Sequence, residues 1–226
     1  MKKYELIGHC NRALSLILDT IKFIERDNDI DITIVTACND DFLDISYNMP
    51  FNPGLPIQET TTKTWEPEPD CFRIVAGMDN DRRRELFSNL EEIFEAEAED
   101  FDNLTHPLSY CSSTTELGYG IFISPNSTLS PFSKIGNFTY INRNVNIGHH
   151  TIIGDFCTIS PGCNISGECL IENNVTIGIG ATILDGLKIG ENSIVGAGSV
   201  VTKDVKCNSV YYGVPAKFIR KKRGEN

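Results

Sequence analysis

Residues 135–176 read IGNFTY INRNVN IGHHTI IGDFCT ISPGCN ISGECL IENNVT when they are written in rows of six. The same register runs from Leu117 to Lys206 as fifteen blocks, and each block begins with Leu, Ile or Val. An α-helix repeats every 3.6 residues and a simple strand every two, so neither produces this period. The pattern predicts a parallel β-helix that is built from hexapeptides.

The repeat also predicts where the other positions of each block point. The fifth residue is small or apolar in every block, so it should face the interior together with the first. The second residue is glycine in seven blocks, as expected where a chain turns tightly without a Cβ. Three cysteines occupy fifth positions, and because the chain has no Cys-x-x-Cys pair we interpret them as small buried side chains: Cys157, Cys163 and Cys169.

Length and composition limit the possible functions. The 226 residues are enough for two modest domains, each with a core of its own. A net charge of -11 argues against nucleic acid or an anionic membrane as the main partner, which favours a small molecule. The N-terminus does not resemble a signal peptide, and no apolar run approaches the roughly 18 residues of a membrane span. We expect a cytoplasmic protein.

The part before the repeat alternates between strand-like and helix-like runs. Apolar, strand-like runs lie at residues 4–7, 32–37 and 72–76, and apolar residues recur at helical spacing in 14–24 and 86–94. This order predicts a small α/β domain with a parallel, Rossmann-like sheet. Ligands of such sheets bind beyond the carboxyl ends of the strands, and the absence of a glycine-rich fingerprint makes a dinucleotide site improbable.

The sequence therefore predicts three segments. Residues 1–102 form the α/β domain, 103–216 the β-helix and 217–226 a basic tail. Within the first segment, residues 49–70 hold five prolines and are expected to be a loop. The basic tail is either solvated or in contact with an anionic ligand.

Two adjacent histidines, His149 and His150, are the only histidines between Leu117 and Lys206. They occupy the third and fourth positions of their block, which should face solvent or a groove. Histidine is well suited to accept a proton near neutral pH, so the pair is a candidate general base. The alternative is a pair of solvated surface side chains.

Several stretches together resemble one branch of the hexapeptide-repeat acyltransferases. The branch contains bacterial sugar acetyltransferases of the sialic acid O-acetyltransferase and bacillosamine-pathway N-acetyltransferase group, and the resemblance covers nearly the whole chain. The matching stretches are residues 40–42, 77–82, 104–107, 141–142, 149–156, 159–162, 166–167, 194–205 and 213–217.

This resemblance implies a left-handed β-helix in which three hexapeptides make one coil, or about five coils in all. It also implies direct transfer from acetyl-CoA, without a metal, to the amino group of a nucleotide-linked amino sugar. Relatives of this group assemble as homotrimers with acetyl-CoA between neighbouring β-helices. The catalytic group is then His149 as general base with His150, Asn142 and the backbone N–H of Gly167.

The remaining site residues are also carried over from the resemblance. Those expected to contact acetyl-CoA are Thr158, Gly167, Ile179, Ala197 and Pro215. Those expected to contact the nucleotide sugar follow the three predicted strands of the first domain: Cys10, Asn11, Arg12, Asp40, Asp41, Gly77 and Asn80.

The chain departs from the family pattern at three places. His150 stands where relatives carry Asp or Glu, and a neutral imidazole cannot supply a carboxylate's charge. Thr158 stands where a close relative has histidine. The turn from Gly8 to Arg12 has a single glycine, so Arg12 could replace backbone donors to a phosphate, or the pocket binds another ligand.

Four classes of function remain to be compared. N-acetylation of a nucleotide-linked 4-amino sugar leads, and O-acetylation of a sugar is its nearest rival. A zinc hydratase of the carbonic anhydrase kind needs three histidine ligands, which the repeat does not supply. A non-catalytic binding scaffold is the fourth class, because solenoids present long interaction surfaces.

Overall fold

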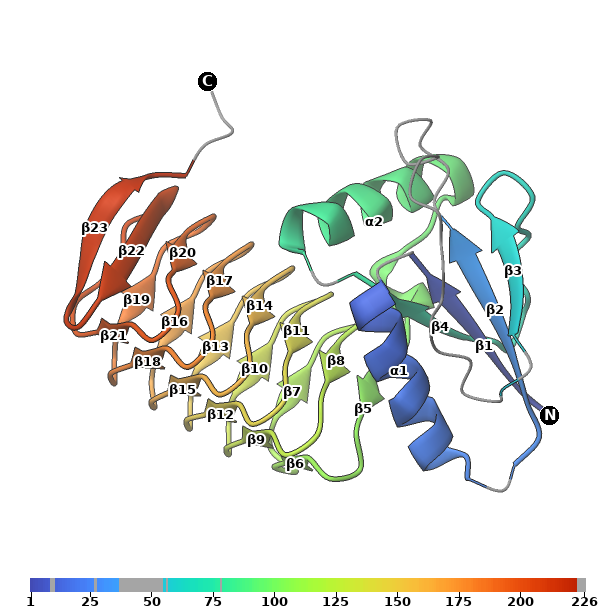
Figure 1. Cartoon of the computed structure of the whole chain (residues 1–226), viewed down its shortest axis with the longest axis horizontal. Helices are drawn as coiled ribbons and strands as arrows, with labels where there is room; N and C mark the ends of the chain where they lie inside the picture. The colour runs from blue at the N-terminus through green and yellow to red at the C-terminus, as the bar shows by residue number, and fades with distance from the viewer. Residues whose placement is uncertain (9–10, 27, 37–54, 56, 78, 223–226) are drawn as a thin grey trace. The chain divides into compact units, whose positions relative to one another are not determined.

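The computed structural model describes residues 1–8, 11–26, 28–36, 55, 57–77 and 79–222. The chain divides into two compact units, Met1–Leu104 and Thr105–Asn226. The division lies two residues beyond the predicted domain boundary, and the two units are described separately (Figure 1).

The first unit contains a four-stranded parallel sheet in the order β3-β2-β1-β4. Its elements include β1 (Lys2–Ile7), α1 (Asn11–Ile24), β2 (Ile30–Thr36), β3 (Ile57–Thr61), β4 (Phe72–Val75), α2 (Asn80–Phe94) and a 3-10 turn, η2 (Ala98–Asp100). The alternation of strands and helices that the sequence predicted is confirmed. Helix α1 buries its predicted apolar face, which includes Leu14, Ile17, Leu18 and Ile21.

Strand β3 corrects the prediction that residues 49–70 form only a loop. It pairs with β2 over Ile57 to Thr61 at the edge of the sheet. Gln58 and Glu59 are exposed, so the strand lacks the apolar alternation that would have indicated it. Hydrogen bonds of the backbone, which any sequence can make, hold this edge strand in place.

A buried acid joins three parts of the first unit. Glu5 in β1 is 3% exposed and accepts hydrogen bonds from Trp65 Nε1 at 3.0 Å and from Arg73 Nε at 2.8 Å. The backbone amide of Glu68 donates to the same carboxylate at 3.2 Å. A buried charge is tolerated only when it is paired and hydrogen-bonded, and this carboxylate is both.

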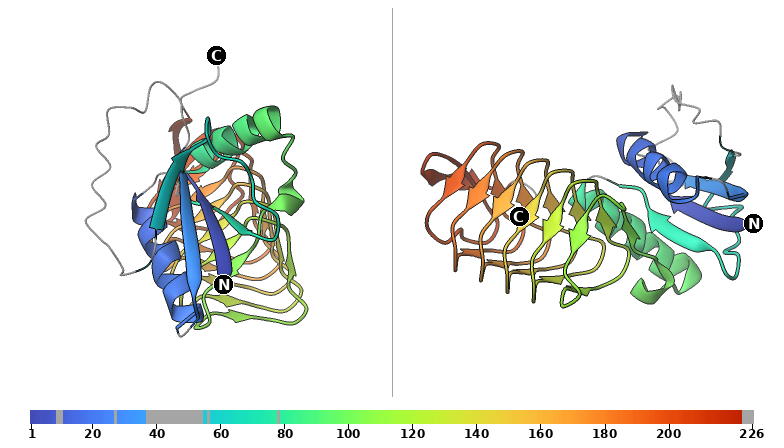
Figure 2. Two further views of the ribbon diagram at one scale, coloured as in Figure 1. Left: turned by 90° about the vertical axis from the view of Figure 1, so that its right-hand side faces the viewer. Right: turned by 90° about the horizontal axis from the view of Figure 1, so that it is seen from below.

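The second unit is a left-handed parallel β-helix whose strands are two residues long and stack in three sheets (Figure 2). Each residue pairs with the residue eighteen positions later, as Ile147 does with Ile165. The coil strands are Leu104–Thr105 (β5), Tyr110–Cys111 (β6), Glu116–Leu117 (β7), Phe122–Ile123 (β8), Thr128–Leu129 (β9), Lys134–Ile135 (β10), Tyr140–Ile141 (β11), Asn146–Ile147 (β12), Ile152–Ile153 (β13), Thr158–Ile159 (β14), Asn164–Ile165 (β15), Leu170–Ile171 (β16), Thr176–Ile177 (β17), Thr182–Ile183 (β18), Lys188–Ile189 (β19), Ile194–Val195 (β20) and Val200–Val201 (β21).

The coils begin earlier than the sequence pattern indicated. Strands β5 and β6 precede the first block at Leu117 and pair with β8 and β9. Their second residues, Thr105 and Cys111, occupy first positions of the repeat without being Leu, Ile or Val. Both are only partly buried at this open end, so a large aliphatic side chain is not required there.

The axis of the β-helix is filled as the repeat predicted. First-position residues from Ile123 to Val201 and fifth-position residues such as Val145 and Ala181 form one buried cluster. Several polar fifth-position side chains also donate to the backbone carbonyl fifteen residues later, as Ser127 does to Asn142 at 2.7 Å and Cys163 to Gly178 at 3.0 Å. Ser133 and Ser193 instead donate to the carbonyl three residues earlier.

The corners of the coils correct the expected role of the second-position glycines. The left-handed conformation falls on the fourth position of every corner from Gly120 to Gly198, with φ between 54° and 72°. The second-position glycines instead allow close approach of adjacent coils. A Cβ on Gly148 would lie 2.4 Å from the backbone nitrogen of Gly167.

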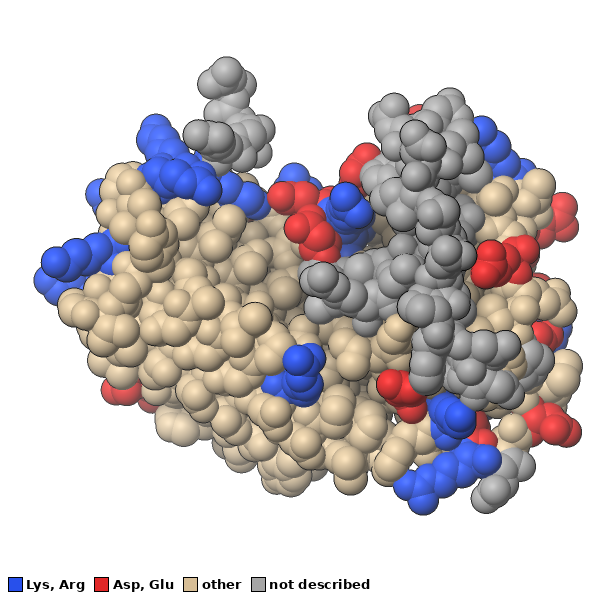
Figure 3. Space-filling view, in the orientation of Figure 1, with Lys and Arg blue, Asp and Glu red and all other residues tan. Residues whose placement is uncertain are grey.

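The C-terminal end differs from the predicted basic tail. Strand β22 (Ser209–Gly213) pairs in parallel with β20, and β23 (Ala216–Lys221) folds back on β22 as an antiparallel hairpin. Lysine and arginine side chains gather over this hairpin (Figure 3), and they include Lys217, Arg220 and Lys221. Residues 217–221 are therefore an exposed strand.

Candidate active site

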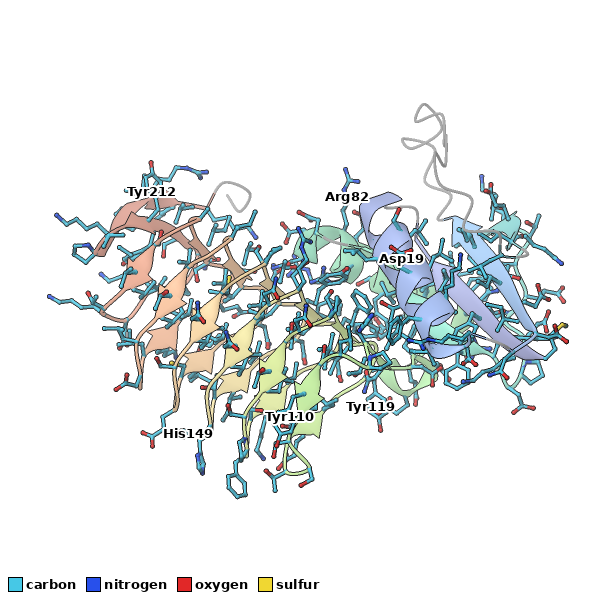
Figure 4. The ribbon with its side chains drawn as sticks, turned by 60° about the horizontal axis from the view of Figure 1, so that its bottom comes forward. Asp19, Arg82, Tyr110, Tyr119, His149 and Tyr212 are labelled. Atoms are coloured by element: carbon cyan, nitrogen blue, oxygen red, sulfur yellow. The ribbon has the colours of Figure 1, made fainter. Side chains whose placement is uncertain are left out.

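His149 and His150 lie at a corner of the β-helix that directly follows β12. Both side chains are exposed, and His149 projects outward from the edge of the coils (Figure 4). The repeat predicted this orientation for the third and fourth positions. One coil earlier the same corner holds Phe132, and one coil later it holds Gly167 and Glu168.

The two imidazoles are in direct contact. His149 Nδ1 and His150 Nδ1 are 3.1 Å apart, and the ring planes meet at 84°. The ring of His150 stacks on Phe132 with centroids 5.0 Å apart and planes inclined by 30°. His150 also adopts the left-handed conformation of this corner, with φ of 57°, and its amide donates to Pro131.

Gly167 lies against the imidazole of His149. A Cβ on Gly167 would be 2.7 Å from Cε1 and 2.8 Å from Nε2 of that ring. The carbonyl of His149 accepts a hydrogen bond from Glu168 at 2.8 Å, which ties the two coils together. Within the described residues, the N–H of Gly167 has no protein acceptor. The corner thus combines a proton acceptor with a nearby backbone donor.

Asn142 is not brought next to His149 within one chain. It follows β11, whereas His149 follows β12, so the two residues stand at successive corners of the coil. Asn142 is 1% exposed, and its side-chain oxygen makes no hydrogen bond to the described residues. The prediction that Asn142 lies near the base is therefore not met by a single copy of the chain.

The residues expected to contact acetyl-CoA are also divided between corners. Ile179 and Ala197 lie at one corner in adjacent coils, where the N–H of Gly198 donates to the Ile179 carbonyl at 2.7 Å. Both side chains are exposed. Thr158 is buried at the start of β14, and Pro215 is exposed between β22 and β23. Only Gly167 shares the corner of His149.

In the first unit, the predicted residues meet at the carboxyl edge of the sheet. Gly8 follows β1 and Gly77 follows β4, and these strands are neighbours. A Cβ on Gly8, whose φ is 124°, would lie 2.7 Å from the Ala76 carbonyl oxygen. Asn80 begins α2 and is buried. The backbone at Gly8 therefore lies so close to Ala76 that only a glycine fits there.

Two of the predicted residues at this edge are described through their backbone, and three are not described. Asn11 and Arg12 form the first turn of α1, which places a helix N-terminus beside Gly8. The predictions for Cys10, Asp40 and Asp41 fall outside the described residues.

Two further residues, which the sequence patterns did not single out, shape these places. Arg83 is 2% exposed, and its guanidinium donates to the Gly77 carbonyl at 2.8 Å and to the Asn80 side chain at 3.3 Å. The sequence did hold a sign of its role, because Arg83 is a charged residue at helical spacing from Leu86 and Leu90 on the buried face of α2. The second residue is Phe132, whose aromatic side chain is 53% exposed and which stands eighteen residues before His150.

The described part of the chain offers no candidate for two other kinds of site. No group of three or more His, Cys, Asp or Glu side chains is arranged to hold a metal ion there. Neither is any helix in those ranges both long and apolar enough for a membrane span.

Comparison with known proteins gives a consistent picture of the fold. Residues 132–167 and 168–203 match the family described as bacterial transferase hexapeptide (six repeats). A comparison with curated protein sequences gave no match.

Solved structures with the same two-part architecture are similar over almost the whole chain. A variant of perosamine N-acetyltransferase from Caulobacter crescentus, in complex with CoA and GDP-perosamine, has a TM-score of 0.75 at 21% identity over 96% of both chains. The acetyltransferase domain of PglB from Neisseria gonorrhoeae, in complex with acetyl coenzyme A, has a TM-score of 0.78 at 23% identity over 96% of this chain and 99% of that one. WeeI from Acinetobacter baumannii has a TM-score of 0.74 at 23% identity over 96% and 100%.

The repeat, the stacked three-sheet coils and these similarities lead to one conclusion. Residues 132–203 match bacterial transferase hexapeptide repeats, and the chain shares its fold with the perosamine N-acetyltransferase and with the PglB acetyltransferase domain.

Proposed function

We propose that this protein is an acetyl-CoA-dependent N-acetyltransferase that acts on the amino group of a nucleotide-linked 4-amino-deoxy sugar. The observation that carries the proposal is the corner at which the ring of His149 lies against Gly167. Perosamine N-acetyltransferase, which shares the fold, is seen with CoA and a GDP-linked amino sugar. The sequence resemblance supports the same substrate class.

His149 acts as the general base in this proposal. Its Nε2 accepts the proton of the sugar's amino group while the nitrogen lone pair attacks the acetyl carbonyl carbon. The carbon–sulfur bond then breaks, and the leaving thiolate of CoA takes up the proton that His149 has accepted. The N–H of Gly167 is the proposed donor to the oxyanion that forms on the carbonyl oxygen.

The acetyl group passes directly from donor to acceptor. Three thiols of the coils, those of Cys157, Cys163 and Cys169, are buried in the axis and donate to backbone carbonyls. Burial raises the pKa of the Cys163 thiol to about 11, so its thiolate is scarce at neutral pH. An acetyl-enzyme on one of these cysteines is not expected.

The site is proposed to be completed by a second copy of the chain. The corner of His149 and the corner of Ile179 and Ala197 are separate edges of one β-helix. A homotrimer with acetyl-CoA between neighbouring β-helices would bring the two edges together.

The carboxyl edge of the first unit's sheet is the proposed site of the nucleotide sugar. Gly8 and Gly77 let the turns of this edge pack closely against Ala76 and Arg83, and two helix N-termini, which favour anionic ligands, start at the same edge. Arg83 fixes the Gly77 turn through its hydrogen bond to the carbonyl. The predicted contacts Cys10, Asn11, Arg12, Asp40, Asp41 and Asn80 complete this set.

The test is transfer from acetyl-CoA to UDP-, dTDP- and GDP-linked 4-amino sugars, followed by release of free thiol. His149→Ala should lower turnover roughly 100- to 10,000-fold, because general-base help is removed. Binding of acetyl-CoA, measured by isothermal titration, should persist. Glu191→Ala serves as the control, since Glu191 is exposed at the same block position of another corner.

Two results would contradict the proposal. If His149→Ala kept near-full turnover, His149 would not be the general base. Failure of the unmodified protein to bind acetyl-CoA at millimolar concentration would favour a non-catalytic scaffold. Transfer to a sugar hydroxyl, with none to any amino sugar, would instead indicate an O-acetyltransferase that uses the same base.

A further inference from the structure

The role of His150 goes beyond the proposed function and rests on it. We infer that His150 is a positioning residue that holds His149 in the tautomer a general base requires. In that tautomer His149 carries its proton on Nδ1 and presents an unprotonated Nε2 to the substrate. His150 correspondingly carries its proton on Nε2.

The hydrogen bond between the two rings carries the inference. The two Nδ1 atoms are 3.1 Å apart, so one of them donates and the other accepts. A base that accepts a proton at Nε2 must already hold its own proton at Nδ1, so His149 is the donor. When His149 takes up the substrate proton, this N–H stays directed at the lone pair of His150.

The surroundings hold His150 in the orientation that this bond needs. Its ring is stacked on Phe132 from the preceding coil, and its backbone is fixed in the left-handed corner. On the other side, Gly167 leaves room for the ring of His149 because it has no Cβ, which would lie 2.7 Å from Cε1 of that ring. The pair is therefore restrained from both neighbouring coils.

No carboxylate takes part in the pair. The acidic groups of the following coils at this corner are Glu168, one coil beyond His150, and Asp185, two coils beyond His149. Lys134 lies in the preceding coil, two residues after Phe132, and pairs with Glu116. Within the described ranges, neither acid forms an ion pair with an imidazole. Neither acid therefore supplies a charge to the pair.

The lack of a carboxylate in the pair predicts how a substitution should change the pH dependence of catalysis. A proton added to the pair ends the supply of an unprotonated Nε2 on His149, so activity falls on the acid side. A carboxylate in place of His150 would favour the protonated form of His149 and would move this fall to higher pH. The native pair should therefore keep working at lower pH than a histidine–carboxylate pair.

Three substitutions at His150 separate the possible roles, and the chain itself supplies their precedents. Phe, Asn and Glu all occupy left-handed corner positions elsewhere, at Phe138, Asn144 and Glu168. His150→Phe keeps an aromatic ring that can stack on Phe132 but removes the acceptor. His150→Asn keeps an acceptor oxygen, and His150→Glu adds a negative charge.

The first measurement is kcat, KM and their pH profiles with acetyl-CoA and the 4-amino sugar nucleotide that is turned over fastest. His150→Phe should lower kcat roughly threefold to tenfold with KM unchanged, the effect of losing one hydrogen bond. His150→Asn should retain most of the native kcat. His150→Glu should move the acid fall up by roughly one pH unit, whereas Glu168→Gln should leave it in place.

The second measurement does not depend on turnover. Nitrogen-15 NMR of the imidazoles reports which ring nitrogen carries the proton, and the chain has only four histidines to assign. Above the titration range, we expect the Nδ1–H form for His149 and the Nε2–H form for His150. His150→Phe should release His149 from the Nδ1–H form.

The outcomes are distinguishable from failure of the proposed function. If no sugar is acetylated but the two tautomers are found as stated, the proposed function fails and the pairing of the rings stands. The inference is overturned if His149 carries its proton on Nε2, or if His150→Phe and His150→Asn reduce kcat equally.

Discussion

Gly167 sets the position of the proposed base through space that a side chain would otherwise fill. Gly167→Ala should displace the imidazole of His149, because the added Cβ would lie 2.7 Å from Cε1. Gly167 has no left-handed φ, so the backbone itself accepts alanine. We expect kcat to fall roughly 100-fold, since a displacement of about 1 Å can cost that much. Steady-state kinetics would measure the fall.

The matched control is Gly186→Asn, one coil beyond Glu168. Nothing lies within 4 Å of a Cβ at Gly186, and asparagine already occupies several left-handed corners. An unchanged kcat in Gly167→Ala would mean that the ring of His149 is not confined by this glycine. Thermal unfolding should differ little between the two variants.

Glu25 provides a pH-dependent contribution to stability in the first unit. Its buried carboxylate accepts hydrogen bonds from Lys2 at 2.5 Å, Tyr4 at 2.5 Å and Asn28 at 2.8 Å. These donors lower the pKa of Glu25 from 4.5 to about 2. A lowered pKa in the folded state adds stability above pH 4.5, and this stability is lost as the pH falls towards 2.

Glu25→Gln should therefore reduce the free energy of unfolding at pH 7 by roughly 1–3 kcal/mol. The same substitution should flatten the decline in stability between pH 4.5 and 2. Urea unfolding across this range would test both effects. Glu116→Gln is the control, because Glu116 pairs with Lys134 at an exposed position. An equal response in the two variants would argue against the assigned role of Glu25.

At the scale of the elements, the fifth position of most hexapeptides holds a small side chain and tolerates a hydrogen-bond donor. Cys163 Sγ donates to the Gly178 carbonyl in the next coil, as the hydroxyl of Thr151 does to Ser166. Cys163→Ser keeps this bond and should change the free energy of unfolding by less than about 1 kcal/mol. Cys163→Leu should destabilise by roughly 1–3 kcal/mol, because it overfills the axis.

Denaturant unfolding would compare the two Cys163 variants. The buried native thiol should also resist an aromatic disulfide reagent until the protein unfolds, because its pKa is about 11. Cys207, which is exposed, is the internal control for reagent access. Greater tolerance of leucine than of serine would contradict the packing described here.

At the scale of the whole molecule, the proposed site between copies can be tested by complementation. Ala197→Trp should block one edge of the site, and His149→Ala should disable the other. Each variant alone should be inactive. If a trimer forms and its chains exchange freely, mixing equal amounts should restore about a quarter of the native activity, because one intact edge can come from each chain. No recovery, or a monomer by light scattering, would argue for a site within one chain.

The sequence by itself determined the coils and the direction of their side chains. A six-residue period is a local property, so the pattern alone predicted that Cys163 is buried and that His149 is exposed. It also located the strand–helix alternation of the first unit. Strand β3 escaped prediction because backbone pairing with β2 specifies it, and the side chains of Gln58 and Glu59 do not.

The tertiary structure alone decided which residues meet across coils. Contacts between His150 and Phe132, and between His149 and Gly167, join residues eighteen positions apart. Which corner a residue occupies depends on the number of strands in a turn, and this count separates Asn142 from His149. The sequence shows the period and polarity of the residues. The distances between residues of adjacent coils are set only when the chain has wound into the β-helix.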